Sequence, residues 1–204
     1  METAGCPLAT GDTLQQFFSD LVLKNYSAIG LRDGAVGEYV ARILAAFVAA
    51  RALYPLRDDA GRGLDSVSAL LAASDPVTGE AGSFAREAVV RRHVGDVALF
   101  FTGMFPESLR RRRGADALLD YVAAGKESYH IVSEYEKTRQ DCEPPVALAA
   151  LAFAVLPEAE PRAALFAVLS VEFERCMYGL NLVKSEIESF SGPMHAAVRS
   201  LLVN

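Results

Sequence analysis

The sequence predicts an all-α fold, a single-domain bundle of about seven to nine helices. Apolar residues recur at spacings of three and four along most of the 204-residue chain, which is the period of an amphipathic helix. No segment alternates strictly between apolar and polar residues over the length of a strand. The composition, 51% hydrophobic and 23% charged, is typical of a globular protein.

Capping residues and prolines set the expected helix boundaries. Asp12 or Thr13 is the expected N-cap of the first helix, and Asp33 caps a second, longer one. The second helix should stop at Tyr54-Pro55, because a residue before proline disfavours the helical conformation. The other helices are expected at residues 64–73, 84–102, 106–113, 116–137, 146–156 and 162–190, and after Pro193. The single domain (residues 1–204) has one alternative border, near residues 141–145, where two consecutive prolines stand.

Charge and cysteine usage exclude several classes of protein. The net charge of −6 argues against a general nucleic-acid or anionic-membrane binder. The three cysteines, Cys6, Cys142 and Cys176, are odd in number and far apart, which suits a reducing cytoplasm. The first residues carry no signal-peptide pattern, and the longest apolar run, 146–156, is about half of the roughly 20 residues that span a bilayer. We therefore expect a soluble cytoplasmic protein with no membrane segment.

The expected helix at 84–102 is apolar on nearly every side and has one carboxylate, Asp96, near its middle. A helix without a polar face is usually a core helix, and a buried carboxylate needs a partner. His93 precedes Asp96 by three residues, so the two can face the same direction. One interpretation is a carboxylate that orients an imidazole beside a metal or a general base. The other is a structural Asp96 that accepts a hydrogen bond and holds a helix pair in register.

Tyrosines on the expected 116–137 helix are the natural partners of Asp96. Tyr121 and Tyr129 lie on one stripe, with Gly125 between them, and a buried tyrosine hydroxyl needs a hydrogen-bond partner. Gly125 would bring a neighbouring backbone or a ligand close. The set His93, Asp96, Tyr121 and Tyr129 is therefore the candidate ligand-binding site, and an ordinary amphipathic helix with half-buried tyrosines is the alternative.

Metal and nucleophile motifs give no catalytic prediction. Glu127 and His130 have the Glu-x-x-His spacing of di-iron bundles, but those sites need two such motifs and two further glutamates. The sequence has no nucleophile elbow, phosphate-binding loop or dinucleotide fingerprint. We expect no catalytic residue, no metal and no cofactor.

The run Arg110, Arg111, Arg112 and Arg113 is the main concentration of positive charge. It is a candidate anion-binding site for a phosphate, an acidic partner or nucleic acid. The alternative is a solvated helix end, because cations near a helix C-terminus complement its dipole.

The segment 95–105, with Tyr121 and with Gly125-x-x-x-Tyr129, resembles a group of uncharacterised bacterial helical proteins. In that group a G-D-x-x-L-F-x-x-G-x-F helix precedes a helix that contains tyrosine and glycine. Residues 14–18 and 39–47 look similar to the opening helices of the group, so the likeness covers roughly the first 135 residues. The resemblance implies a helical bacterial domain and transfers no function or site residue.

These observations favour a non-enzymatic binding or regulatory protein, whose partner is a protein or a small molecule. An apolar helix face offers a route to a homo-oligomer. The alternative is an enzyme or small-ligand binder with its pocket around His93, Asp96, Tyr121 and Tyr129.

Overall fold

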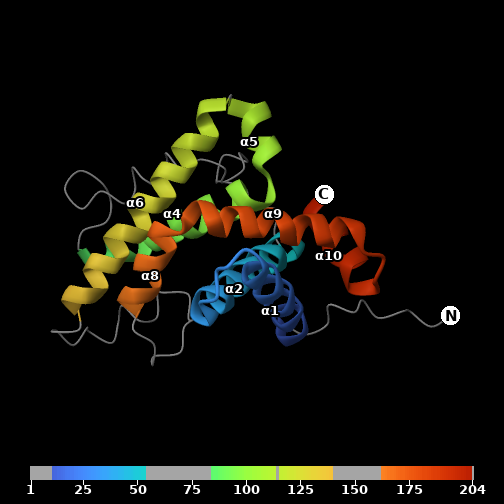
Figure 1. Cartoon of the computed structure of the whole chain (residues 1–204). Coiled ribbons are helices and arrows are strands. Elements are labelled where there is room, and N and C mark those ends of the chain that lie inside the picture. The colour runs from blue at the N-terminus through green and yellow to red at the C-terminus, as the bar shows by residue number, and fades with distance from the viewer. Residues whose placement is uncertain (1–10, 54–83, 114, 140–161, 204) are drawn as a thin grey trace. The chain divides into compact units, whose positions relative to one another are not determined.

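The computed structural model describes residues 11–53, 84–113, 115–139 and 162–203, which form eight helices (Figure 1). No strand occurs within these ranges, so the predicted all-α, multi-helix class is confirmed. The helices expected at 64–73 and 146–156, the border at 141–145, and Cys6 and Cys142 lie outside the described residues. None of the described helices combines the length and apolar composition needed to cross a membrane.

The chain divides into two compact units, residues 1–64 with 175–204 and residues 65–174. The expectation of one domain over residues 1–204 stays a prediction. Each unit has its own core, and the second unit contains all four residues of the candidate ligand-binding site.

The first unit contains α1 (Gly11–Ala28), α2 (Gly34–Leu53), most of α9 (Phe173–Ser189), and α10 (Pro193–Val203). The hydroxyl of Ser19 donates to Glu38, and the side chain of Leu23 packs on Gly37, so α1 packs against the first turns of α2. Tyr26, at the end of α1, is buried, and its hydroxyl donates to the backbone oxygen of Cys176 on α9 at 3.0 Å.

The turn between α1 and α2 follows from Gly30 and Asp33. Gly30 has a φ of 81°, and the amide groups of Gly30 and Leu31 donate to the carbonyl oxygens of Ser27 and Tyr26. This pattern is a Schellman C-cap, which needs a left-handed residue after the helix. Asp33 Oδ1 then accepts from the amide groups of Ala35 and Val36, at 3.0 and 3.2 Å, so the predicted N-cap of the second helix is confirmed.

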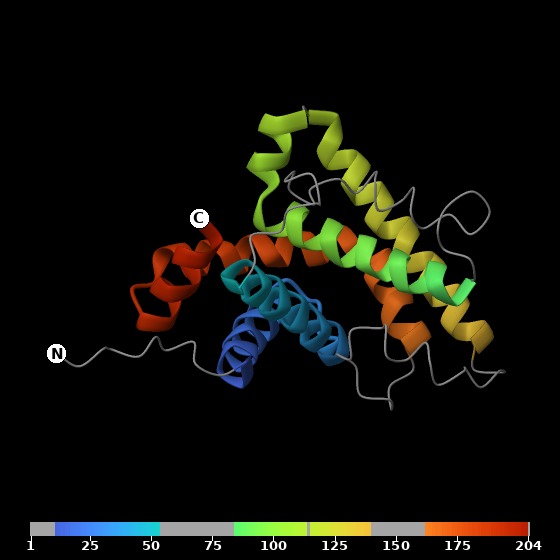
Figure 2. The same cartoon turned by 180° about the vertical axis from the view of Figure 1, so that it is seen from behind.

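The second unit contains α4 (Phe84–Met104), α5 (Pro106–Arg113), α6 (Ala115–Arg139), α8 (Arg162–Val171) and the first two residues of α9. Tyr129 of α6 meets Gly95 of α4, and Gly125 of α6 meets Ala98, so the two helices are antiparallel. Ser133 of α6 bonds the oxygen of Ala163, and Ser170 bonds the oxygen of Lys126, which makes α8 antiparallel to α6 as well. Figures 1 and 2 show α6 beside both helices.

Three boundaries differ from the sequence-based prediction. Helix α1 begins at Gly11, so the expected N-cap residues Asp12 and Thr13 lie inside its first turn. The helix expected to end at 102 continues to Met104, because the amide of Phe105 still bonds Phe101 and the chain leaves the helix only before Pro106, which has no amide proton. The prediction of one long helix over 162–190 was wrong. The chain forms α8 and α9, separated at Glu172, where neither glycine nor proline marks the break.

Candidate functional site

The hydroxyl of Tyr129 donates a hydrogen bond to Asp96 Oδ1 at 2.9 Å. This contact joins the middle of α6 to the middle of α4. Tyr129 has no exposed surface, whereas Asp96 is half-buried. Of the two interpretations of Asp96, the structure contains the partner that the structural one requires, a buried tyrosine on a neighbouring helix.

Gly95 makes this contact possible. A Cβ atom built on Gly95 would lie 2.5 Å from Cε1 of the Tyr129 ring, so only glycine leaves room for the ring against α4. The other sides of the ring meet Phe166, at 5.8 Å between ring centroids, and Phe173, at 6.1 Å. Tyr129 is therefore enclosed by aromatic side chains from α8 and α9 and by the backbone of α4.

The space at Gly125 is filled by the protein itself. A Cβ atom there would lie 2.5 Å from the Phe173 ring and 3.0 Å from Cβ of Ala98. Sequence analysis predicted a close approach at Gly125 by a backbone or a ligand. The group that approaches is the ring of Phe173, a residue with no exposed surface.

His93 lies on the exposed side of α4, one turn before Asp96. The helix is therefore more exposed in its first half than the sequence predicted, because the polar run Arg91-Arg92-His93 faces outward in part and continuous burial begins only at Val94. Partial burial of the imidazole lowers the pKa of His93 from its ordinary value of 6.5, and the charge of Arg92 lowers it further. Burial and the charge of Arg92 thus both favour the neutral imidazole, although His93 as a whole residue is exposed.

Tyr121 is buried, with 4% of its surface exposed, and it lies eight residues before Tyr129 on α6. Eight residues correspond to about 12 Å along a helix. The structure thus brings Tyr129 to Asp96. It places Tyr121 in the core nearer the N-terminal end of α6, and it leaves His93 on the exposed side of α4.

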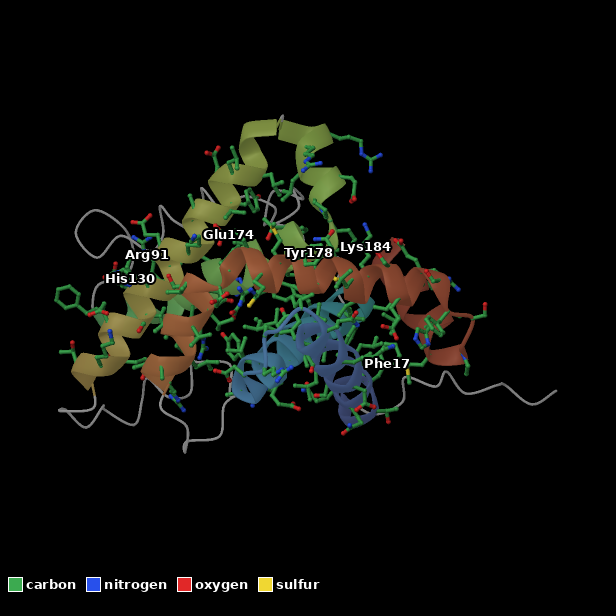
Figure 3. All side chains as sticks on the ribbon, viewed as in Figure 1. Phe17, Arg91, His130, Glu174, Tyr178 and Lys184 are labelled. Atoms are coloured by element: carbon green, nitrogen blue, oxygen red, sulfur yellow. The ribbon has the colours of Figure 1, made fainter. Side chains whose placement is uncertain are left out.

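An ion pair and a hydroxyl are further polar groups in the described part of the second unit. Arg91 Nε lies 3.6 Å from Glu87 Oε1 on the same face of α4, and both side chains are largely buried. Ser128, next to Tyr129, has no exposed surface, and its Oγ has no hydrogen-bond partner among the residues that the structure describes. At the surface, Lys126 Nζ donates to Glu174 Oε1 at 2.7 Å, at the start of α9 (Figure 3). This hydrogen bond lowers the pKa of Glu174, although partial burial opposes the shift.

Glu127 and His130, the pair with di-iron spacing, both lie on the exposed face of α6, and Figure 3 labels His130 there. Within the described ranges, no group of three or more His, Cys, Asp or Glu side chains is arranged to hold a metal ion. The pair therefore gains no further metal ligand from the fold in this part of the chain.

The arginine run forms the second half of α5. Arg110 and Arg111 are exposed, and Arg111 Nε donates to the backbone oxygen of Glu107 at 3.4 Å. The backbone of Arg112 and Arg113 completes the helix, and their side chains lie outside the described part of the structure. Anion binding by these four residues stays a prediction.

Sequence analysis missed the aromatic partners of Tyr129. Phe166 and Phe173 belong to a segment that begins 33 residues after Tyr129, and only the packing of α8 against α6 brings them to it. Their positions within apolar helical stripes mark them as core residues, but nothing in the sequence pairs them with Tyr129.

No protein-family model, curated protein or solved structure matches this chain. The resemblance to a group of uncharacterised bacterial helical proteins therefore stays a prediction.

Proposed function

We propose that this chain is a non-enzymatic binding or regulatory protein and that its Asp96–Tyr129 pair has a structural role. The observation that carries the proposal is the commitment of Tyr129 to internal contacts. Its ring rests on Gly95 and its hydroxyl donates to Asp96. A side chain enclosed in this way holds two helices in register and offers no face to a substrate.

The pair suits this role energetically. A hydrogen bond to a charged acceptor contributes about 1.5–3 kcal/mol, and loss of one partner leaves the other group unsatisfied. Because Tyr129 is fully buried and Asp96 is half-buried, the contact is partly shielded from water. It thus favours one register of α4 against α6 over the alternatives.

Native mass spectrometry of the full chain, purified without refolding, tests the proposal. We expect the mass of the chain alone, or of complexes with other protein chains. A stoichiometric small molecule that Asp96→Ala releases and Glu127→Gln retains would contradict it. Glu127 is a suitable control because it is an exposed carboxylate on α6, away from the pair.

The alternative is a small-ligand site, or an enzyme, built around His93, Asp96, Tyr121 and Tyr129. It has one supporting observation: His93 and Asp96 both keep access to water on neighbouring turns of α4. A ligand at this position would contact the neutral imidazole of His93. The variant His93→Ala separates the two ideas, because it removes that contact and leaves the Asp96–Tyr129 hydrogen bond in place.

A cytoplasmic location belongs to the same proposal. The sequence has three cysteines, an odd number, and they stand far apart, which suits a reducing compartment. A bacterial origin and homo-oligomerisation through an apolar helix face remain predictions, and light scattering of the purified protein tests the second.

A further inference from the structure

The helix α5 concentrates positive charge in an acidic chain. Four consecutive arginines, residues 110–113, form its second half, and they are four of the 20 Lys and Arg residues of a protein with a net charge of −6. Their charges oppose the charge of the remainder of the chain. A local field of this kind attracts an anionic partner to one position on the surface.

The helix is anchored on one side and open on the other. Leu109 is buried, with 7% of its surface exposed, and its amide donates to the oxygen of Phe105 at 3.3 Å. Phe105 packs against Phe100, at 5.6 Å between ring centroids. Figures 1 and 2 show α5 beside the beginning of α6. The buried side fixes α5, and Arg110 and Arg111 project from it to solvent.

The guanidinium groups of Arg110 and Arg111 are not neutralised within the described part of the second unit. No described carboxylate forms an ion pair with either of them, and the bond from Arg111 to the oxygen of Glu107 is long, at 3.4 Å. Three lysines of the described residues, in contrast, are paired with carboxylates. Lys24, Lys126 and Lys137 each have a glutamate oxygen within 2.7 Å.

We propose that α5 docks an acidic protein segment, whose carboxylates bind Arg110 and Arg111. This inference rests on the proposed binding function and adds the chemical class of the partner. Guanidinium groups bind carboxylates in a planar, two-pronged geometry, which suits such a segment. Leu119, in the first turns of α6, is 68% exposed, so this helix, which packs beside α5, offers an apolar side chain to such a segment. The net charge of −6 disfavours a long nucleic acid, because the whole surface would repel it.

Fluorescence anisotropy with the full chain tests the proposal. The probe is a labelled 12-residue peptide of four Glu-Glu-Leu repeats, titrated at low and at physiological salt. We expect saturable binding that weakens with salt, and at least about a tenfold loss of affinity, or 1.4 kcal/mol, in Arg110→Glu/Arg111→Glu. The control Arg32→Glu/Arg162→Glu makes the same change in net charge elsewhere and should keep the affinity. Both double variants are checked for helix content by circular dichroism.

Three outcomes would overturn the proposal. The first is no binding of the peptide by the folded protein, and the second is an equal loss in both double variants. The third is a single-stranded DNA of equal charge that binds the same arginines more tightly than the peptide, which would assign α5 to polyanions. These results leave the proposed function standing, whereas a small molecule released by Asp96→Ala would contradict that function without bearing on α5.

Discussion

Tyr129 of α6 packs directly on Gly95 of α4: a Cβ atom at position 95 would lie only 2.5 Å from the tyrosine ring. The hydroxyl of the same tyrosine donates a hydrogen bond to Asp96, the next residue of α4. Two adjacent residues of one helix thus hold a single side chain of the other, Gly95 by its lack of a side chain and Asp96 by its carboxylate.

Replacement of Gly95 by alanine should destabilise the protein by about 1–3 kcal/mol, although glycine-to-alanine changes inside a helix usually stabilise by up to 1 kcal/mol. The added methyl group would lie 2.5 Å from a ring that has no room to move, because Phe166 and Phe173 pack against it. Urea denaturation followed by circular dichroism measures the change.

Gly34→Ala is the matched control for Gly95→Ala. Gly34 is also in a helix, but a Cβ atom there would have no atom within 4 Å. The control should be neutral or stabilising. If both variants change the urea midpoint in the same direction and to the same extent, the close contact with Tyr129 is not the reason that position 95 is glycine.

Gly30→Ala should lower the free energy of unfolding by about 1–2 kcal/mol, because a left-handed backbone with a φ of 81° is unfavourable for a residue with a Cβ atom. Gly30→Asn should cost less, since asparagine tolerates this conformation better. No atom lies within 4 Å of the added Cβ, so the cost is conformational and not steric. Equal midpoints for the wild type and the alanine variant would show that the turn relaxes.

The lowered pKa of Glu186 predicts that the protein loses stability at acid pH. Burial raises the pKa of this carboxyl, but hydrogen bonds from Lys24 Nζ, at 2.6 Å, and Asn25 Nδ2, at 3.0 Å, outweigh burial, and the net shift is downward from 4.5. A carboxyl whose pKa is lower in the folded state stabilises the fold above its unfolded pKa. That contribution disappears as the pH falls through the folded pKa.

Urea midpoints measured between pH 7 and pH 3 test the role of Glu186. The variant Glu186→Gln should be less stable than the wild type at pH 7, and the difference should shrink below pH 4. Glu188→Gln serves as the control, because Glu188 is exposed on the same helix. A gap between wild type and Glu186→Gln that stays constant over the whole range would contradict the assignment.

The helices follow from local signals in the sequence, and the contacts between them do not. The N-cap Asp33 and the prolines at 106 and 193 predict helix starts that the structure contains. The break at Glu172 has no such signal, because neither glycine nor proline stands beside it.

The candidate site was predictable only in part. The buried Asp96 pointed to a tyrosine partner on the 116–137 helix, because both groups need a hydrogen bond when buried. The choice of Tyr129 over Tyr121 depends on the register of two antiparallel helices. Gly95 contributes to that register, because it leaves room on α4 for the ring of Tyr129. The packing of Phe166 and Phe173 around Tyr129 depends on α8, which is distant in sequence. Local sequence patterns therefore do not predict it.

A double-mutant cycle on Asp96 and Tyr129 tests the central claim most directly. The single variants Asp96→Ala and Tyr129→Phe and the double variant are unfolded in urea at pH 7. A structural pair predicts a loss of about 1–3 kcal/mol for Asp96→Ala and a coupling energy of at least about 0.5 kcal/mol between the two sites. Additive losses, or an unchanged melting temperature for Asp96→Ala, would contradict the claim that this pair holds α4 and α6 together.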